Sequence, residues 1–335
     1  MGDIDPMAIE LHRDTIVIDG LIISKWDRQI FEDMHHGGLT AANCTCAVWE
    51  GFTETMDNIA NWKRLMTEND DILLQVYDVD DIRRAKEENR VGIILGWQNT
   101  YPIESNLDRL RLFSDLGVRF MQLTYNNQTP LAGGCFEPKD SGVSRFGYAV
   151  IEEMNRLDMI VDLSHAGKQT CMDAIHLSSK PIAISHANPS FFHKALRNID
   201  NDVLIELAKK NGFIGLSLYP YHLKNLGKCT IEDYCSMVKQ LINLIGIEHI
   251  GIGSDLCKNW PDEVVMWMRN GRWTKKIDYG ESTSKSTAWP EQPSWFTKAS
   301  DLKNIFESLV INGLTDDQAF KIIGTNWFEF MKNHF

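Results

Sequence analysis

The feature of this 335-residue chain that most limits its fold is a repeated alternation of short β-type runs with amphipathic helical patterns. Between the runs, apolar side chains recur at helical spacing, as Leu107, Leu110 and Phe113 do. The predicted strands are 16–23, 41–48, 91–96, 119–124, 159–163, 181–185, 213–218 and 249–253, with an additional strand at 72–77. The predicted helices are 80–88, 106–117, 146–157, 168–178, 202–210 and 231–245. Eight strand–helix units in one chain predict an α/β fold, the (β/α)8 TIM barrel.

The organisation of the chain favours one domain. A doubly wound sheet is the alternative to a barrel, but no Gly-rich phosphate loop follows the first predicted strand. No linker or shift in composition divides the sequence, so we predict a single domain over residues 1–335. Residues 257–297 interrupt the alternation after the eighth strand and hold five of the ten tryptophans, at positions 260, 267, 273, 289 and 295. Long segments in this position form substrate lids, so we predict a Trp-rich lid insertion over 257–297.

Charge and composition restrict the partners. Acidic residues outnumber basic ones by 46 to 34, giving a net charge of −12 with no basic block, which argues against nucleic acid and anionic membranes. No run approaches the roughly 18 apolar residues that span a bilayer, and the N-terminus lacks the pattern of a secretion signal. The seven cysteines are scattered and odd in number, which favours reduced thiols and a cytoplasmic location. The acidic surface and the aromatic insertion are compatible with a homodimer.

Polar side chains follow several of the predicted strands at the end where barrels carry their function. His165 follows the fifth strand, His186 the sixth, and Asp255 the eighth. Neutral imidazoles bind divalent metals, a bound metal lowers the pKa of water toward about 7, and a carboxylate can move the proton of that water. These three residues therefore predict a hydrolytic metal site. The third and fourth strands end in Gln98, Tyr125 and Asn126.

A family resemblance is carried by motifs at the same strand ends. They are Val161-Asp-Leu-Ser-His165, Ile184-Ser-His186, Leu196-Arg-Asn198, Gly251-Ile-Gly-Ser-Asp255 and Gly324-Thr-Asn-Trp327, together with residues 116–130. Together they resemble the membrane (renal) dipeptidases, which are the zinc peptidases of family M19 among the amidohydrolase-like barrels. The resemblance covers nearly the whole chain, from Ile16 to Trp327. It implies a TIM barrel that hydrolyses a dipeptide or another small amide with the help of zinc.

The resemblance also implies roles for individual residues. His165 and His186 match zinc ligands, and Asp255 matches the acid–base aspartate of the family. Arg197 matches the arginine that holds the carboxylate of the substrate, a role that suits the forked guanidinium. Tyr125 stands where the family has a histidine that faces the substrate, and Asn126 follows it. We therefore predict that Arg197, Tyr125 and Asn126 bind the substrate.

Three departures from the family pattern fall at the metals. The family binds two zinc ions and carries a His-x-Asp pair on its first strand, where this chain has Leu21 and Ile23. The bridging glutamate of the family is matched by Gln98, which keeps a carbonyl oxygen but loses the charge. We predict one zinc ion at most, bound by His165, His186 and the oxygen of Gln98. A further hypothesis is that the ammonium group of Lys25 replaces part of the lost metal charge, against the simpler reading of a solvated loop lysine.

Three functions fit these residues. The first is a one-metal dipeptidase or related hydrolase. The second is a different small-metabolite enzyme on the same scaffold, acting on a cationic or betaine-like compound, because tryptophan faces attract quaternary ammonium groups. The third is a binding protein without catalytic activity, suggested by the lost metal positions at Leu21, Ile23 and Gln98.

Overall fold

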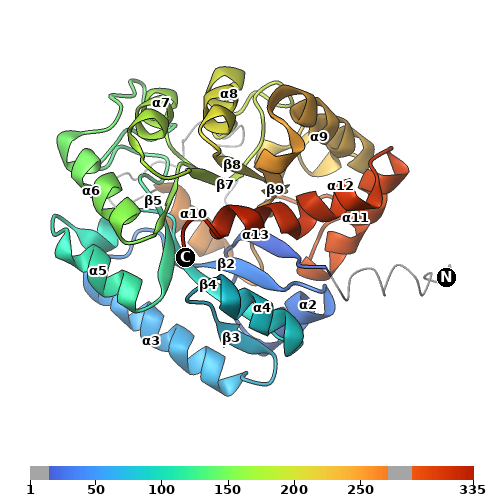
Figure 1. Ribbon diagram of the computed structural model, residues 1–335, viewed down its shortest axis with the longest axis horizontal. Helices are drawn as coiled ribbons and strands as arrows, with labels where there is room; N and C mark the ends of the chain where they lie inside the picture. The colour runs from blue at the N-terminus through green and yellow to red at the C-terminus, as the bar shows by residue number, and fades with distance from the viewer. Residues whose placement is uncertain (1–14, 271–288) are drawn as a thin grey trace.

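A closed barrel of eight parallel strands forms the centre of the computed structural model, which describes residues 15–270 and 289–335 (Figure 1). The barrel strands are β1 (Ile18–Ile22), β2 (Ala41–Ala47), β4 (Val91–Trp97), β5 (Val118–Gln122), β6 (Ile160–Asp162), β7 (Ala183–Ala187), β8 (Phe213–Leu216) and β9 (Ile250–Ile252). Each strand pairs with the next in this order, and β1 pairs with β9 to close the ring. The predicted (β/α)8 TIM barrel is confirmed.

The additional strand predicted at 72–77 is β3 (Leu73–Gln75), which lies outside the ring. It pairs with residues 91–93 at the start of β4, whereas β5 pairs with β4 from Leu95 onward. β4 therefore has three neighbours, and β3 extends the sheet only at the start of the strand.

Helices surround the barrel and run between its strands (Figure 1). They are α2 (Arg28–His36), α3 (Phe52–Glu68), α4 (Val79–Glu87), α5 (Asp108–Asp115), α6 (Arg145–Arg156), α7 (Lys168–Leu177), α8 (Asn201–Lys209), α9 (Ile231–Ile245), α10 (Asp262–Asn270), α11 (Leu302–Ile311), α12 (Asp316–Phe320) and α13 (Asn326–Met331). Several begin at capping side chains, such as Asp78, Ser144 and Thr230, which accept hydrogen bonds from the first turn of α4, α6 and α9. The residues at which these helices begin are thus determined by the local sequence.

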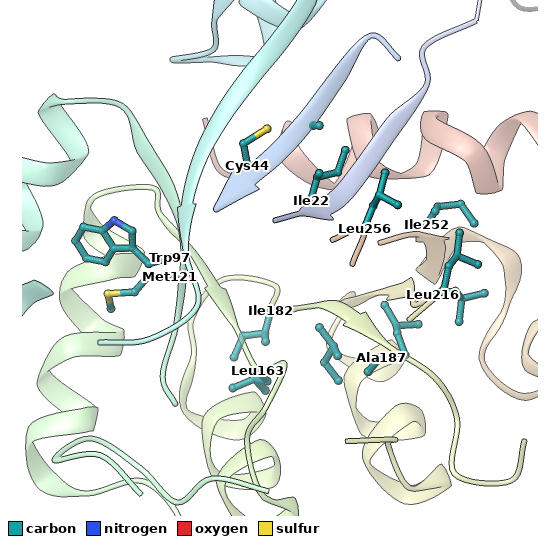
Figure 2. Packing of buried hydrophobic residues seen from close by; sticks show 14 of the residues in the cluster. Ile22, Cys44, Trp97, Met121, Leu163, Ile182, Ala187, Leu216, Ile252 and Leu256 are labelled. Atoms are coloured by element: carbon teal, nitrogen blue, oxygen red, sulfur yellow. The ribbon is translucent and has the colours of Figure 1, made fainter. Parts of the chain in front are cut away.

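The main hydrophobic core lies between the barrel and its helices. The labelled side chains in Figure 2 come from around the ring, among them Ile22 on β1, Cys44 on β2, Met121 on β5 and Leu216 on β8. All of these side chains are buried. Cys44 and the other six cysteines are free thiols, which agrees with the predicted reduced state. In the described part of the chain, no helix combines the length and the apolar character needed to cross a bilayer.

Trp327 on α13 closes the end of the barrel where the strands begin. Its ring packs against Phe120 and Phe213, and its Nε1 donates to the carbonyl oxygen of Ile252 at 2.7 Å. A methyl group added at Gly20, Gly215 or Gly251 would lie 2.4, 3.0 or 2.7 Å from this ring. These glycines leave the room that the indole fills, and the opposite end of the barrel is left to form a site.

Candidate functional site

A pocket with an empty volume of about 480 Å³ lies where the barrel strands end. Its walls include six residues that the sequence analysis singles out: Gln98, Tyr125, Asn126, His165, Arg197 and Asp255. Ile23, Tyr219, His222, Cys257, Val265, Met268 and Trp289 complete the lining. His186 is fully buried directly behind His165. The structure thus brings all seven predicted site residues to one place.

The imidazoles of His165 and His186 approach each other through their Nε2 atoms at the wall of the pocket. Their Nε2 atoms are 3.1 Å apart, and their ring planes meet at 63°. The ring of Tyr125 stacks on that of His165, with ring centroids 4.0 Å apart. Two imidazole nitrogens bound to a single zinc ion lie roughly 3.0–3.5 Å apart, given Zn–N bonds of about 2.0–2.1 Å. The spacing of the two histidines therefore suits one shared cation.

The buried carboxylate of Asp162 positions His186 through two serines. Its Oδ1 accepts hydrogen bonds from the backbone N–H and the hydroxyl of Ser164 and from the backbone N–H of Ser185. Its Oδ2 accepts from the Ser185 hydroxyl at 2.5 Å and from Gln122 at 3.1 Å. Ser185 Oγ in turn lies 2.8 Å from Nδ1 of His186. Five hydrogen bonds hold this carboxylate at the end of β6 and, with it, the ring of His186.

The hydrogen-bond partners determine which ring nitrogens carry protons. Ser185 gives its only hydroxyl proton to the Asp162 carboxylate, so toward His186 it accepts, and Nδ1 of His186 carries the proton. Asn126 Oδ1 is 2.6 Å from Nδ1 of His165 and can only accept, so that nitrogen is protonated as well. Both Nε2 lone pairs consequently point toward the same space. Metal-binding histidines are oriented in this way, with the second nitrogen donating to an oxygen.

The electrostatics of the pocket favour neutral histidines. Burial lowers the pKa of both His165 and His186 well below the ordinary value of 6.5, and the nearby positive charge of Arg197 lowers both further. Protonation of either Nε2 atom is therefore unfavourable, and both nitrogens keep their lone pairs. The two imidazoles fit a single divalent cation.

A second cation does not fit the opposite side of the pocket. Leu21 and Ile23 are 2 % and 5 % exposed and pack with Val48, Trp49 and Met268. Gln98 donates from Nε2 to Thr45 Oγ1 at 2.9 Å, which leaves its neutral carbonyl oxygen as the group available to the pocket. Residues 15–270 and 289–335 contain no cluster of three histidine, cysteine or carboxylate side chains that could hold a metal.

Arg197 brings an incompletely satisfied positive charge to the pocket. Its side chain is 3 % exposed, and Nη2 donates to the carbonyl oxygen of His186 at 3.1 Å. Nη1 is buried and has no hydrogen-bond partner, and the guanidinium forms no ion pair with any described residue. A buried guanidinium with an unused donor is suited to an anionic partner, and a carboxylate matches its fork.

Three pocket residues have left-handed backbone conformations. The φ angles are +60° at Asn126, +67° at His165 and +55° at Asp255. Histidine and aspartate adopt this region infrequently, and such conformations cluster at functional sites. The backbone N–H of Asp255 donates to the carbonyl oxygen of Leu21 at 3.0 Å, which ties the loop after β9 to β1.

His222 is a pocket residue that the sequence analysis did not select. It is 2 % exposed, and its Nδ1 lies 2.8 Å from Ser217 Oγ. Asn188 and Asn198 both donate to its carbonyl oxygen. The signal was available, because His222 follows β8 just as the other site residues follow their strands. The hypothesis for Lys25 is wrong: this residue is exposed and lines a neighbouring groove instead of the pocket.

The described part of the 257–297 segment contributes to the pocket. Val265 and Met268 on α10 and Trp289 line its mouth. Trp289 Nε1 donates to the carbonyl oxygen of Trp260, and Trp260 Nε1 donates to that of Ile23. Residues 271–288, which include Trp273, lie outside the described residues, and Trp295 instead donates to Cys229 at the side of the barrel.

Comparisons with known proteins agree with this geometry. A family model described as membrane dipeptidase (peptidase family M19) matches residues 28–264. The chain is 32% identical to an uncharacterized dipeptidase of Schizosaccharomyces pombe over 60% of this chain and 50% of that protein. It is 30% identical to the dipeptidase tcpJ of Claviceps purpurea over 67% of this chain and 56% of that protein. The chain thus spans about half the length of the curated relatives it matches.

Solved structures are similar over nearly the entire chain. An amidohydrolase from Pseudomonas aeruginosa is 36% identical with a TM-score of 0.91, covering 97% of this chain and 98% of that one. A metallo peptidase from Rhodobacter sphaeroides, liganded with a phosphinate mimic of the dipeptide L-Ala-D-Ala, has a TM-score of 0.79 at 17% identity. The matched region comprises 96% of this chain and 100% of the metallo peptidase, and at this identity the similarity is one of fold.

Proposed function

This chain belongs to the membrane dipeptidase family, peptidase family M19, and on that premise we propose that it hydrolyses the amide bond of a dipeptide or a similarly small amide. The observation that carries the proposal is the buried Arg197, whose Nη1 lacks a partner in the same pocket as His165 and Asp255. A substrate carboxylate placed at Arg197 would supply the missing anion and orient the rest of the molecule toward the two histidines.

The remaining residues have complementary roles in this proposal. Asp255 takes the proton of the attacking water and returns it to the nitrogen of the leaving group. A divalent ion such as zinc, held by His165 and His186 with the carbonyl oxygen of Gln98 as a further ligand, would activate water and polarise the scissile carbonyl. Asn126 fixes the tautomer of His165, and Tyr125 covers one face of the ring of that histidine.

Metal analysis tests the proposed ion count. We expect the purified protein, dialysed against zinc and then desalted, to retain at most one zinc ion per chain, measured by mass spectrometry of the metal content. Replacing both ligands, as His165→Gln with His186→Gln, is expected to abolish retention. Two tightly bound ions per chain would contradict the reduced site.

Hydrolysis of a dipeptide panel in the presence of Zn²⁺ or Mn²⁺ tests the activity. Arg197→Met removes the carboxylate partner, and we expect kcat/KM to fall by about 100-fold, the loss that follows from deleting one charge-assisted contact of a few kcal/mol. The matched control is Arg64→Met, which removes an exposed arginine on α3 and should leave kcat/KM unchanged. No turnover of any dipeptide or small N-substituted amino acid with either metal would refute the proposed activity.

A second candidate function is a different enzyme on the same scaffold that acts on a betaine-like compound. It is favoured by Trp289 and Tyr125, two aromatic side chains that line the same pocket as Arg197 and Asp255. Thermal-shift measurements with betaines and with the corresponding primary amines would separate the candidates, because only cation–π recognition favours the quaternary compounds.

A further inference from the structure

One side of the pocket is built from apolar side chains, here named the apolar wall: Ile23, Tyr125, Met268 and Trp289. Behind it, Leu21, Val48 and Trp49 fill the space out to the ends of β1 and β2. Trp49 also packs edge-on against Tyr125, with centroids 5.2 Å apart, and donates from Nε1 to the carbonyl oxygen of Met268. The wall is thus a packed surface that joins the first two strands to the segment after β9.

The described lining of the pocket carries few charges. Among the described lining residues, the charged side chains are Arg197 and Asp255. Arg197 is assigned to the carboxylate of the substrate, and Asp255 to proton transfer. Gln98, which also lines the pocket, is neutral. With Asp255 committed to proton transfer, the described lining offers no further carboxylate to pair with a positive charge on the acyl half of the substrate.

A dipeptide brings such a positive charge. Its acyl half carries an α-ammonium group next to the scissile bond, and removing that group from water against apolar side chains without an anionic partner is strongly unfavourable. An acyl group without the amine gains from the same wall, because apolar burial is favourable in proportion to the area removed from water.

We propose that the acyl half of the substrate is apolar and uncharged, so that the preferred substrate is an N-acylated amino acid and not a dipeptide with a free amino terminus. This inference rests on the proposed function for the position of the carboxylate at Arg197. Hydrolysis of such a compound consumes one water: its hydroxyl bonds to the acyl carbon as the C–N bond breaks, and its proton reaches the leaving nitrogen through Asp255. The products are a carboxylic acid and a free amino acid.

The decisive experiment uses a matched pair, Leu-Ala and N-(4-methylpentanoyl)-alanine, which differ only in the α-amino group. Binding is measured by calorimetry on the metal-free protein, and hydrolysis is measured separately with added Zn²⁺. We expect the acyl compound to bind about tenfold more tightly or better, the effect of leaving one ammonium group unpaired. Equal or tighter binding of Leu-Ala overturns the inference.

The two readouts keep this inference separate from the proposed function. Hydrolysis of Leu-Ala with higher kcat/KM than the acyl compound would sustain the amide hydrolase and overturn the acyl preference. Tighter binding of the acyl compound without hydrolysis of either compound would sustain the preference and overturn the hydrolase. Tightest binding by N,N,N-trimethyl-Leu-Ala would assign the wall to cation–π recognition and overturn the uncharged acyl group.

A pair of variants at the wall tests the cause. Ile23→Asp places a carboxylate in the pocket, and Ile23→Asn introduces a similar polar group without charge. We expect Ile23→Asp to shift the preference at least tenfold toward Leu-Ala and Ile23→Asn to leave the ratio between the two compounds within about twofold, as expected for a charge-specific effect. Equal shifts in both variants would show that the charge is not the cause. Since Ile23→Asp places a carboxylate in a packed surface, its fold is checked by thermal melting; the wild-type pair decides the question if the variant does not fold.

Discussion

The two halves of the barrel mouth are built by opposite means. At the ends of β1 and β2, Leu21, Ile23 and Trp49 form an apolar cluster. At the ends of β6 and β7, Asp162, Ser185 and His186 form a chain of hydrogen bonds from a buried carboxylate to an imidazole. Both halves are nearly inaccessible to water.

This difference shows that equivalent positions of one barrel can carry unrelated chemistry. In the packed half, the volume of the side chains matters most, so that apolar residues of similar size can replace one another. The hydrogen-bonded half is specified by direction and charge, since a buried polar group left without a partner is costly. The pocket between them combines the imidazole of His165 with an apolar surface, and each half can be perturbed separately.

The largest expected effect on folding lies in the hydrogen-bonded half. Asp162→Asn keeps the size of the side chain but replaces one carboxylate oxygen by an NH₂ group. In one orientation of the amide this group faces the Ser185 hydroxyl and the Gln122 amide, and in the other it faces the donors of Ser164; in both, donors face donors. We expect the free energy of unfolding to fall by about 3 kcal/mol, measured by urea denaturation.

The control for this substitution is Asp173→Asn. Asp173 accepts hydrogen bonds from Val143 and Gln169 but is half-buried, so we expect a loss below about 1 kcal/mol. Similar losses at the two positions would mean that the network around Asp162 is not exceptional.

A smaller effect is expected in the packed half. Leu21→Ala removes a side chain that is 2 % exposed and leaves a cavity, which should lower the free energy of unfolding by about 2–3 kcal/mol without changing zinc retention at His165 and His186. Ile311→Ala, at a position that is 82 % exposed, serves as the neutral control. Loss of zinc from Leu21→Ala would show that the two halves are coupled.

The smallest effect, counted per histidine and per pH unit, is that of acidification. Burial lowers the pKa of His222 well below its ordinary value, with a further decrease from Arg197, and burial lowers the pKa of His334 to about 4. Between pH 6.5 and these depressed values, the unfolded chain binds a proton at each residue that the folded chain does not. Stability is therefore retained above pH 6.5 and lost as the pH falls, by about 1.4 kcal/mol per pH unit for each histidine.

Urea denaturation of the metal-free protein at pH 7, 6 and 5 measures this slope. His222→Gln and His334→Gln should each make it shallower. His222 lies in the pocket, whereas His334 hydrogen-bonds to the carbonyl oxygen of Pro181 near the start of β7, so the pair compares the two ends of the barrel. A slope unchanged in both variants would contradict the assignment.

The fold follows from the sequence because its signals are periodic. Every barrel strand falls within or beside a predicted run, and α9 (Ile231–Ile245) has the predicted bounds, since apolar spacing and the Thr230 cap act locally. Two predicted helices differ in their bounds: α5 (Asp108–Asp115) is two residues shorter at each end than the predicted 106–117, and α8 (Asn201–Lys209) begins and ends one residue before the predicted 202–210.

The site is less predictable because its geometry depends on distant segments. Strand-end position and motif together identify His165, His186 and Asp255. His222 also follows a strand but belongs to no motif, and a short 3-10 turn (Pro220–His222) carries it back to the pocket. The apolar wall joins Ile23 to Met268 and Trp289, which are more than two hundred positions away in the chain. Such contacts arise only from the closed barrel.

The left-handed backbone at His165 and Asp255 has a consequence for protein engineering. Glycine would relieve about 1 kcal/mol of backbone strain at each position, so a selection for thermal resistance alone would reward the loss of both side chains. Libraries screened without an activity assay should therefore accumulate inactive, more heat-resistant variants at these two codons. Their frequency would measure how much robustness this protein gives up to keep an imidazole and a carboxylate in the pocket.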